Sequence, residues 1–191
     1  MVKNIVLIGC GELGSRHLQG IALYPEVSNI YVVEPFETSQ TRAKERYDEV
    51  NRTNHNLNFL NKLEELPNIL DMVIIATNAD IRASIVQELL GIKKVYNLVL
   101  EKVLFQKIDD YEIVDKILMD TDTKCWVNHP KRMYPFYQDL KVKLKEIKYA
   151  NITVSGGDWG LACNGLHHLD IFEFLFDNEL SSINSSLGKK L

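Results

Sequence analysis

The chain has 191 residues, of which 46% are hydrophobic and 25% charged, so it has the composition of an ordinary globular protein and not of a collagenous, disordered or membrane-spanning one. Its net charge is -4 and its basic residues are scattered along the sequence, which argues against a nucleic acid or an anionic membrane as a partner. A small molecule is therefore the expected ligand.

Short apolar runs alternate with longer amphipathic stretches over most of the chain, which is typical of a parallel sheet covered by helices on both faces. Strands are predicted at residues 4–8, 30–33, 57–60, 72–76, 95–100 and 125–128. Helices are predicted at residues 12–23, 38–51, 80–90 and 108–119. Gly91 should cap the third helix, and Ile113 and Ile117 should face the core from the fourth. The sequence predicts an α/β fold with a doubly wound Rossmann domain over residues 1–122.

From residue 130 the pattern changes. One helix is predicted over residues 131–147, interrupted near Pro135, and an alternating strand over residues 150–155. A glycine-containing loop at 156–160 then leads into a helix at 164–176, and the polar tail at 181–191 should be frayed. Residues 123–191 are therefore predicted to begin an α+β substrate domain that is incomplete in this chain.

The hexapeptide GCGELG follows the first predicted strand and opens the first predicted helix. In this context Gly9 allows a tight turn, Gly11 lets the backbone approach a pyrophosphate, and Gly14 allows the helix to lie close to the strand. The start of the helix, at Glu12 and Leu13, offers backbone N–H groups to phosphates. The alternative is a doubly wound domain whose glycines serve only the turn. The motif predicts a dinucleotide site.

An acidic residue, Glu34, ends the second predicted strand, where a dinucleotide-binding fold carries the carboxylate that binds the adenosine ribose. This carboxylate should accept hydrogen bonds from the ribose hydroxyls and repel a 2′-phosphate. The expected cofactor is therefore NAD, and NADP is disfavoured.

Ligands of open α/β sheets bind beyond the carboxyl ends of the strands. Thr77, Asn78 and Glu101 follow or end two later strands and are expected to contact the cofactor. Lys102 is the most informative residue at these ends, because its ammonium should lie near the nicotinamide. The alternative for Lys102 is an ordinary surface lysine.

At this point the chain resembles the Gfo/Idh/MocA family of oxidoreductases over nearly its whole length. No one motif is specific, but their order and spacing together are. The motifs are the glycine loop with Ser15-Arg16-His17, then Ala76-Thr77-Asn78, Glu101-Lys102-Val103 (similar to Glu-Lys-Pro), Asn128 with Arg132 and Pro135, and Gly165, His167 and Asp170 (similar to Asp-x-Gly-x-His-x-x-Asp).

The resemblance implies hydride transfer between NAD(P) and a hydroxyl-bearing carbon of a sugar, a cyclitol or a related small molecule. It implies catalytic roles for Lys102, which orients the hydroxyl, and His167, which takes or returns its proton. It also implies substrate contacts from both residues and from Asn128, Arg132 and Cys163. Family members often use the C-terminal domain as a subunit interface, so the resemblance implies a homo-oligomer through that domain.

The sequence departs from the family pattern in three ways. Val103 replaces the proline after the lysine, which removes a backbone constraint. Cys163 stands where the family has aspartate, and it is interpreted as a small core residue in preference to a nucleophile. The chain also ends soon after the predicted helix that carries His167, so it is either a fragment of a longer protein or a shortened form.

These departures leave other functions open. The leading hypothesis is an NAD-dependent oxidoreductase. The alternative is an NAD(H)-binding module or sensor without catalysis, and a third possibility is an aldehyde- or thioester-handling enzyme that uses Cys163.

The cysteine pattern bears on the compartment and on metals. Cys10, Cys125 and Cys163 are odd in number and lack CxxC spacing, which argues against a disulfide framework and a structural zinc site. No metal is expected. The apolar run at residues 5–8 is too short for a signal-peptide core, and the expected location is cytoplasmic.

Overall fold

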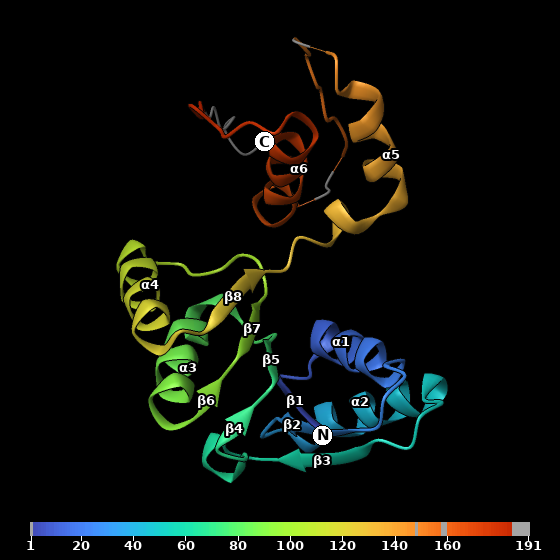
Figure 1. Cartoon of the computed structure of the whole chain (residues 1–191), viewed down its shortest axis with the longest axis vertical. Helices are drawn as coiled ribbons and strands as arrows, with labels where there is room; N and C mark the ends of the chain where they lie inside the picture. The colour runs from blue at the N-terminus through green and yellow to red at the C-terminus, as the bar shows by residue number, and fades with distance from the viewer. Residues whose placement is uncertain (1, 148, 158–159, 185–191) are drawn as a thin grey trace. The chain divides into compact units, whose positions relative to one another are not determined.

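The computed structural model describes residues 2–147, 149–157 and 160–184. It divides into two compact units, residues 1–128 and 129–191, and Figure 1 shows the elements of each. The first unit extends past residue 122 because strand β8 (Lys124–Val127) pairs with β7 (Asn97–Leu100). Among the helices in the described ranges, none has the length and apolar character that crossing a membrane requires.

The first unit is built on a six-stranded sheet whose neighbouring strands are all parallel. From one edge to the other the strands are β3 (Asn56–Leu60), β2 (Ser28–Val33), β1 (Lys3–Ile8), β5 (Met72–Ile75), β7 and β8. The chain builds outward from β1 through β2 and β3, then returns to the other side of β1 with β5. In open α/β sheets ligands bind where the strand order reverses in this way. The topology therefore predicts a ligand site at the carboxyl ends of β1 and β5.

Helices cover both faces of this sheet (Figure 1). In chain order they are α1 (Glu12–Ala22), α2 (Glu37–Val50), α3 (Ala79–Ile92) and α4 (Ile108–Thr121). Ile5 and Leu7 of β1 belong to the core cluster that contains residues of α1 and α2, whereas Val6 and Ile8 belong to the cluster that contains residues of α3 and α4. Successive side chains of a strand point to opposite faces. The continuous apolar run of β1 is therefore explained by burial on both sides, and the doubly wound fold is confirmed.

The strand predicted at 95–100 is divided in the structure. β6 (Lys94–Val95) pairs with β4 (Ile69–Leu70) in a separate two-stranded sheet, and β7 begins two residues later. The change of sheet occurs at Tyr96, whose amide donates to the carbonyl of Leu70 at 3.0 Å. The sequence of this run does not reveal such a step, because each short strand contributes buried side chains, Val95 from β6 and Leu98 and Leu100 from β7.

Two predicted helix details are wrong. α3 continues through Gly91, where an added Cβ would meet no atom within 4 Å, and it ends at Ile92. The helix can therefore pass through Gly91 without needing it as a cap. In α4, Ile113 is exposed and Val114 is buried, with Ile117 packed beside it. The prediction for Ile117 is thus confirmed, and the prediction for Ile113 is wrong because its neighbour Val114 takes the buried position.

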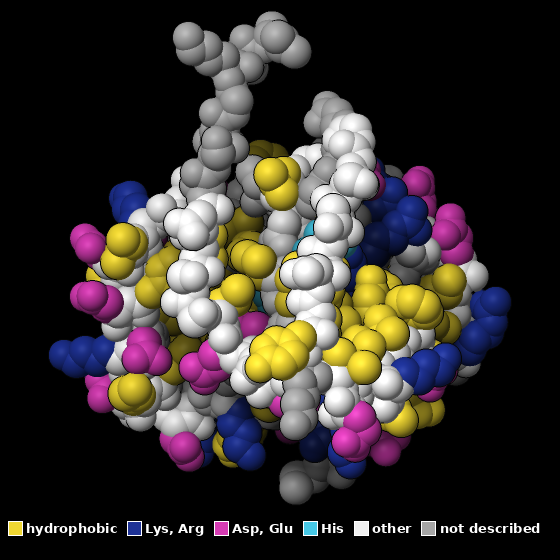
Figure 2. Space-filling model, turned by 90° about the horizontal axis from the view of Figure 1, so that it is seen from above, with side chains coloured by type: hydrophobic (Ala, Val, Ile, Leu, Met, Phe, Trp, Pro, Cys, Tyr) yellow, Lys and Arg dark blue, Asp and Glu magenta, His cyan; other side chains and the backbone are white. Residues whose placement is uncertain are grey.

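The second unit contains a 3-10 helix, η2 (Pro130–Met133), followed by α5 (Pro135–Leu144) and α6 (Leu161–Phe176). The predicted interruption near Pro135 is confirmed, because proline lacks an N–H and disfavours a helical residue before it. Ile171 and Leu175 are the buried hydrophobic residues of this unit among those described. Other apolar side chains, including Met133, are exposed, and Figure 2 shows hydrophobic side chains gathered on the face that it views.

The strand predicted at 150–155 is wrong, because these residues are irregular and exposed. An isolated strand leaves its N–H and C=O groups unpaired, and no other described segment pairs with this one. The predicted loop at 156–160 includes residues 158–159, which lie outside the described residues, as does 185–191 of the predicted frayed tail.

Candidate functional site

The glycine loop joins β1 to α1, and its glycines meet different steric demands. Gly9 has a φ of +83°, and a Cβ there would lie 2.8 Å from Cγ2 of Thr77. A Cβ on Gly14 would lie 2.0 Å from the carbonyl oxygen of Gly9, so the start of α1 can approach the loop only with glycine at this position. A Cβ on Gly11 would meet nothing within 4 Å. The backbone at Gly11 is therefore open to a ligand.

A cavity of about 660 Å³ lies at the carboxyl ends of β1 and β5. It is lined by five of the predicted cofactor residues, Gly9, Gly11, Glu34, Thr77 and Asn78, and by residues that were not predicted, among them Phe36, Ser39, Asn61, Leu63 and Ile81. The cavity is of the size that holds a small ligand. It lies where the strand order of the sheet reverses.

Polar groups around this cavity fit a dinucleotide. Helices α1 and α3 begin at Gly11 and Asn78, and neither begins with a side-chain cap, so backbone N–H groups of their first turns are open to an anion. The Thr77 hydroxyl is buried without a hydrogen-bond partner among the described residues. Two uncapped helix starts, the open backbone at Gly11 and this hydroxyl suit the phosphates and sugars of a dinucleotide.

Glu34 is buried at the wall of the cavity and holds two loops together. Its Oε2 accepts a hydrogen bond from the amide of Cys10 at 2.9 Å, and its Oε1 accepts one from the amide of Phe36 at 3.2 Å. A carboxylate has about four acceptor positions, so capacity for ribose hydroxyls remains. Burial, followed by the nearby Glu34 charge, raises the pKa of the Cys10 thiol to about 12. Cys10 is thus an inert packing residue of the loop.

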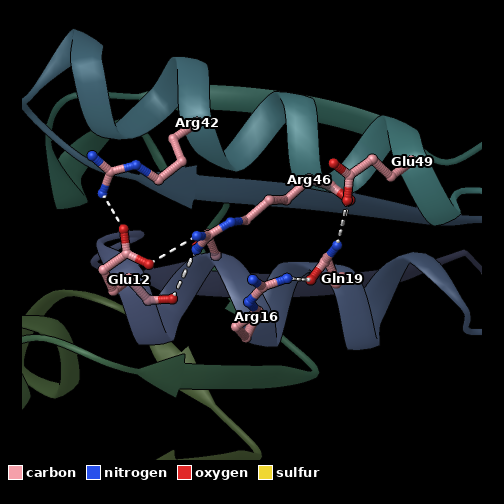
Figure 3. A network of polar contacts seen from close by, with 7 residues as sticks. Glu12, Arg16, Gln19, Arg42, Arg46 and Glu49 are labelled. Atoms are coloured by element: carbon pink, nitrogen blue, oxygen red, sulfur yellow. Dashed lines mark hydrogen bonds and ion pairs between the residues drawn. The ribbon is translucent and has the colours of Figure 1, made fainter.

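The side chain of Glu12 is directed toward α2 (Figure 3). It forms ion pairs with Arg42 and Arg46, each at 2.8 Å, and the hydrogen bond from Arg46 lowers the pKa of the carboxyl. Leu13 is exposed. Neither side chain lines the cavity, so any part that these residues take in binding belongs to their backbone amides.

Glu101 directly follows β7 and lies in a buried hydrogen-bond network. Its Oε1 contacts Nε2 of His17 at 2.7 Å and accepts from Nδ2 of Asn128 at 2.5 Å, and its Oε2 accepts from the amide of Lys102 at 3.2 Å. Burial alone would raise the pKa of Glu101, but the hydrogen bonds from His17 and Asn128 outweigh it and hold the pKa below its ordinary value. Glu101 thus joins α1, β7 and the end of β8.

This lowered pKa makes a prediction about acid stability. A carboxyl whose pKa is lower in the folded than in the unfolded state stabilises the fold above its unfolded pKa of about 4.3, and the stabilisation is lost as the pH falls through the folded pKa. Glu101→Gln should therefore weaken the dependence of the unfolding free energy on pH below about 4.3. Urea unfolding at a series of pH values measures it. The exposed control Glu45→Gln should retain the wild-type slope, and an equal slope in Glu101→Gln would contradict the assignment.

Lys102 follows β7 and is held through the backbone around it. The peptide bond between Lys102 and Val103 is cis, where the family resemblance leads one to expect proline after the lysine. The guanidinium of Arg82, buried in α3, donates to the carbonyls of Glu101 and Val103, both at 2.5 Å. It also donates to the carbonyl of Thr77 at the cavity wall. Arg82 therefore connects the Lys102 segment to the cavity.

The second unit contains a further polar cluster. Nε of Arg132 donates to Oδ1 of Asp170 at 2.8 Å, and the rings of His129 and His167 meet edge to face with centroids 5.5 Å apart. Oδ2 of Asp170 and Nδ1 of His129 are buried without a hydrogen-bond partner among the described residues. Arg132, predicted to contact substrate, is thus held by Asp170 beside the histidines.

Cys163 is exposed, so its interpretation as a buried core residue is wrong. Among the described side chains of α6, the buried ones are Ile171 and Leu175, both more than two turns further along. His168 is adjacent to His167 on α6 and therefore lies on a different face of the helix. Burial, followed by the charge of Lys131, lowers the pKa of His168.

The predicted site residues fall into four groups. Gly9, Gly11, Glu34, Thr77 and Asn78 share the cavity, and Glu12, Leu13 and Gly14 lie at the start of α1 outside its lining. Glu101, Lys102 and Asn128 lie together at neighbouring strand ends, and Arg132, Cys163 and His167 belong to the second unit.

The prediction of site residues omitted Arg82 and His17. Arg82 shares its helical face with buried Val86 and Leu89, and a cation on an apolar face was a usable signal. His17 stands three residues after Gly14, but its partner Glu101 is 84 residues away in sequence. Sequence alone gives no sign of that contact.

Solved structures share this fold. The crystal structure of scyllo-inositol dehydrogenase from Lactobacillus casei superposes with a TM-score of 0.70 at 16% identity, covering 92% of this chain and 55% of that one. Myo-inositol 2-dehydrogenase from Lactobacillus plantarum superposes with a TM-score of 0.70 at 15% identity, covering 93% of this chain and 57% of that one. At such identities the likeness shows the fold, and the chain spans little more than half the length of these proteins.

A comparison with curated protein sequences gives no significant match. The sequence model of the Gfo/Idh/MocA family, described as an oxidoreductase family with an NAD-binding Rossmann fold, matches residues 3–129. This match covers the whole sheet, the glycine loop and the cavity, and the chain therefore belongs to the Gfo/Idh/MocA oxidoreductase family.

Proposed function

We propose that the chain is the cofactor-binding part and the beginning of the substrate-binding part of an NAD-dependent oxidoreductase. Its substrate is a sugar, a cyclitol or a related small molecule, and the reaction transfers hydride between NAD and a hydroxyl-bearing carbon of that substrate. The observation that carries the proposal is the cavity at the strand reversal, with Lys102 on the neighbouring strand end and tied to its wall through Arg82. The inositol dehydrogenases that share the fold support this substrate class.

The residues of the first unit bind the cofactor in this proposal. The amides at the starts of α1 and α3 bind the phosphates, and the Thr77 hydroxyl donates to a cofactor oxygen. Glu34 accepts hydrogen bonds from the adenosine ribose while keeping the amides of Cys10 and Phe36. NAD supplies the nicotinamide carbon that exchanges hydride with the substrate.

Lys102 and His167 act on the substrate hydroxyl. The ammonium of Lys102 donates a hydrogen bond to the substrate oxygen and stabilises negative charge that develops there. The imidazole of His167 accepts the hydroxyl proton when the alcohol is oxidised and returns it in the reverse direction. Arg132, held by Asp170, binds a further hydroxyl of the substrate, and Asn128 and Cys163 complete its surroundings.

The preference for NAD is testable through Glu34. Glu34→Gln removes a charged acceptor worth about 1.5–3 kcal/mol, so NADH should bind at least about tenfold more weakly. The loss of negative charge should also narrow the difference in affinity between NADH and NADPH. Fluorescence titration with both cofactors measures these changes, and Glu37→Gln, an exposed carboxylate at the start of α2, is the matched control. Wild-type protein that binds NADPH as tightly as NADH would overturn the assignment of Glu34.

Enzyme and binding module are distinguished by two measurements on the wild-type chain. Both predict that NADH fluorescence changes on binding. The oxidoreductase hypothesis also predicts that the absorbance of reduced nicotinamide rises when NAD and a panel of inositols and sugar alcohols are supplied. Binding without turnover of any of them favours the NAD(H)-binding module, to which exposed Cys163 in place of the family aspartate points. The absence of NADH binding would contradict both hypotheses.

A cytoplasmic location rests on the cysteine pattern, and assembly into a homo-oligomer rests on the family resemblance. Both stay predictions.

A further inference from the structure

Arg82 is a buried cation whose hydrogen bonds reach two separate segments of the first unit. Its side chain lies on α3, and the residue is 3% exposed. Nη1 donates to the carbonyls of Glu101 at 2.5 Å, Val103 at 2.5 Å and Leu104 at 2.9 Å. Nη2 donates to the carbonyl of Thr77. One side chain therefore holds the wall of the cavity and the chain on both sides of Lys102.

This arrangement requires a guanidinium. Its planar fork directs several N–H donors along different directions, whereas a lysine ammonium is a single point with three donors. The segment from Glu101 to Leu104 leaves the sheet, so its carbonyls have no partner strand to bond. Arg82 supplies the carbonyls of Glu101, Val103 and Leu104 with donors from outside the segment.

The charged groups around Arg82 favour a fixed position for its guanidinium. Burial lowers the pKa of the guanidinium, and the nearby carboxylate of Glu101 opposes that shift. Glu101 is itself fixed by His17 and Asn128. The backbone carbonyl of Glu101 bonds Arg82 while its carboxylate bonds the amide of Lys102, so the residue before the lysine is held at both ends.

We propose that Arg82 is a positioning residue for Lys102: it fixes the backbone that carries the lysine relative to the cofactor cavity, and thereby orients the ammonium for the reaction. The catalytic part of this statement rests on the proposed function, whereas the fixing of Lys102 does not. Arg82 contacts carbonyls of the chain itself and is not assigned a contact with substrate.

The test compares Arg82→Lys with wild type in the full 191-residue chain. Lysines are labelled by reductive methylation with ¹³C-formaldehyde, and the resonance of Lys102 is identified by its absence in Lys102→Arg. In Arg82→Lys we expect the Lys102 resonance to shift more than that of any other lysine. Where wild type turns over an alcohol, kcat should fall by about 100-fold with an unchanged KM for NAD, as a misplaced reacting group predicts.

Two matched variants separate positioning from general stability. Arg52→Lys alters an exposed arginine whose hydrogen bond is to the adjacent carbonyl of Asn51. Val32→Ala destabilises the other core cluster at β2, which β1 separates from β5 and β7. Both should leave the Lys102 resonance in place, and a shift in Val32→Ala equal to that in Arg82→Lys would overturn the proposal.

An unshifted Lys102 resonance in folded Arg82→Lys would likewise overturn it, as would an unchanged kcat. Failure of the proposed function has a different appearance, because wild type itself would then bind no NADH or turn over none of the alcohols, whatever the Lys102 resonance does in Arg82→Lys.

Discussion

Gly14→Ala is expected to abolish NADH binding and to destabilise the first unit by about 3 kcal/mol or more, because overpacking here meets backbone and not a movable side chain. The added Cβ would lie 2.0 Å from the carbonyl oxygen of Gly9 and 2.9 Å from its carbonyl carbon. To relieve this contact, α1 must move away from the loop, and the amides at its start move with it. Urea unfolding and NADH fluorescence titration measure the two effects.

Gly91→Ala is the matched control for this substitution. Gly91 lies within α3, where an added Cβ meets no atom within 4 Å. Alanine should therefore stabilise the helix by about 0.5–1 kcal/mol through its better propensity, without changing NADH binding. A Gly14→Ala protein that binds NADH as wild type does would show that the close contact between loop and helix is not needed for the site.

Lys102→Ala is expected to lower turnover by about 10²–10⁴-fold while NADH affinity stays unchanged, because the ammonium acts on the substrate oxygen and not on the dinucleotide. The lining of the cavity supports this separation, since Gly9, Glu34 and Thr77 contribute to it and Lys102 does not. Initial rates of NAD reduction, together with fluorescence titration, measure the two quantities on one preparation.

Lys107→Ala serves as the control for Lys102→Ala. Lys107 is an exposed lysine just before α4, and its side chain makes no capping hydrogen bond. Its removal should affect neither rate nor binding. Turnover that survives Lys102→Ala would reject the lysine as a catalytic residue, and parallel loss of NADH binding would reassign it to the cofactor.

Much of the first unit could be predicted because its signals are local. The apolar run of β1, the glycines after it and Glu34 lie within a short stretch of sequence, and the structure gathers them at one cavity. The division of residues 94–100 into β6 and β7 could not be predicted, because it depends on pairing with β4. The strand expected at 150–155 failed for the same reason, since alternation indicates a strand only where a partner exists.

The candidate site shows the same distinction between local and distant signals. Lys102 was identified from its place after a strand, whereas the residues that hold it, Arg82 and His17, come from other elements. On α4, Val114 is buried in place of Ile113. These two apolar residues are adjacent, and the sequence pattern alone does not decide which of them faces the core. Contacts that decide such choices lie far apart in sequence, and a single sequence does not report them.

The position of Glu34 has a consequence for the entropy of binding. One of its oxygens accepts a hydrogen bond from the amide of Cys10 in the glycine loop. The other accepts a hydrogen bond from the amide of Phe36 at the entry to α2. Both loops are therefore ordered by the carboxylate before any dinucleotide arrives. Their conformational freedom is lost during folding and not during binding, so a larger share of the contact energy remains as affinity.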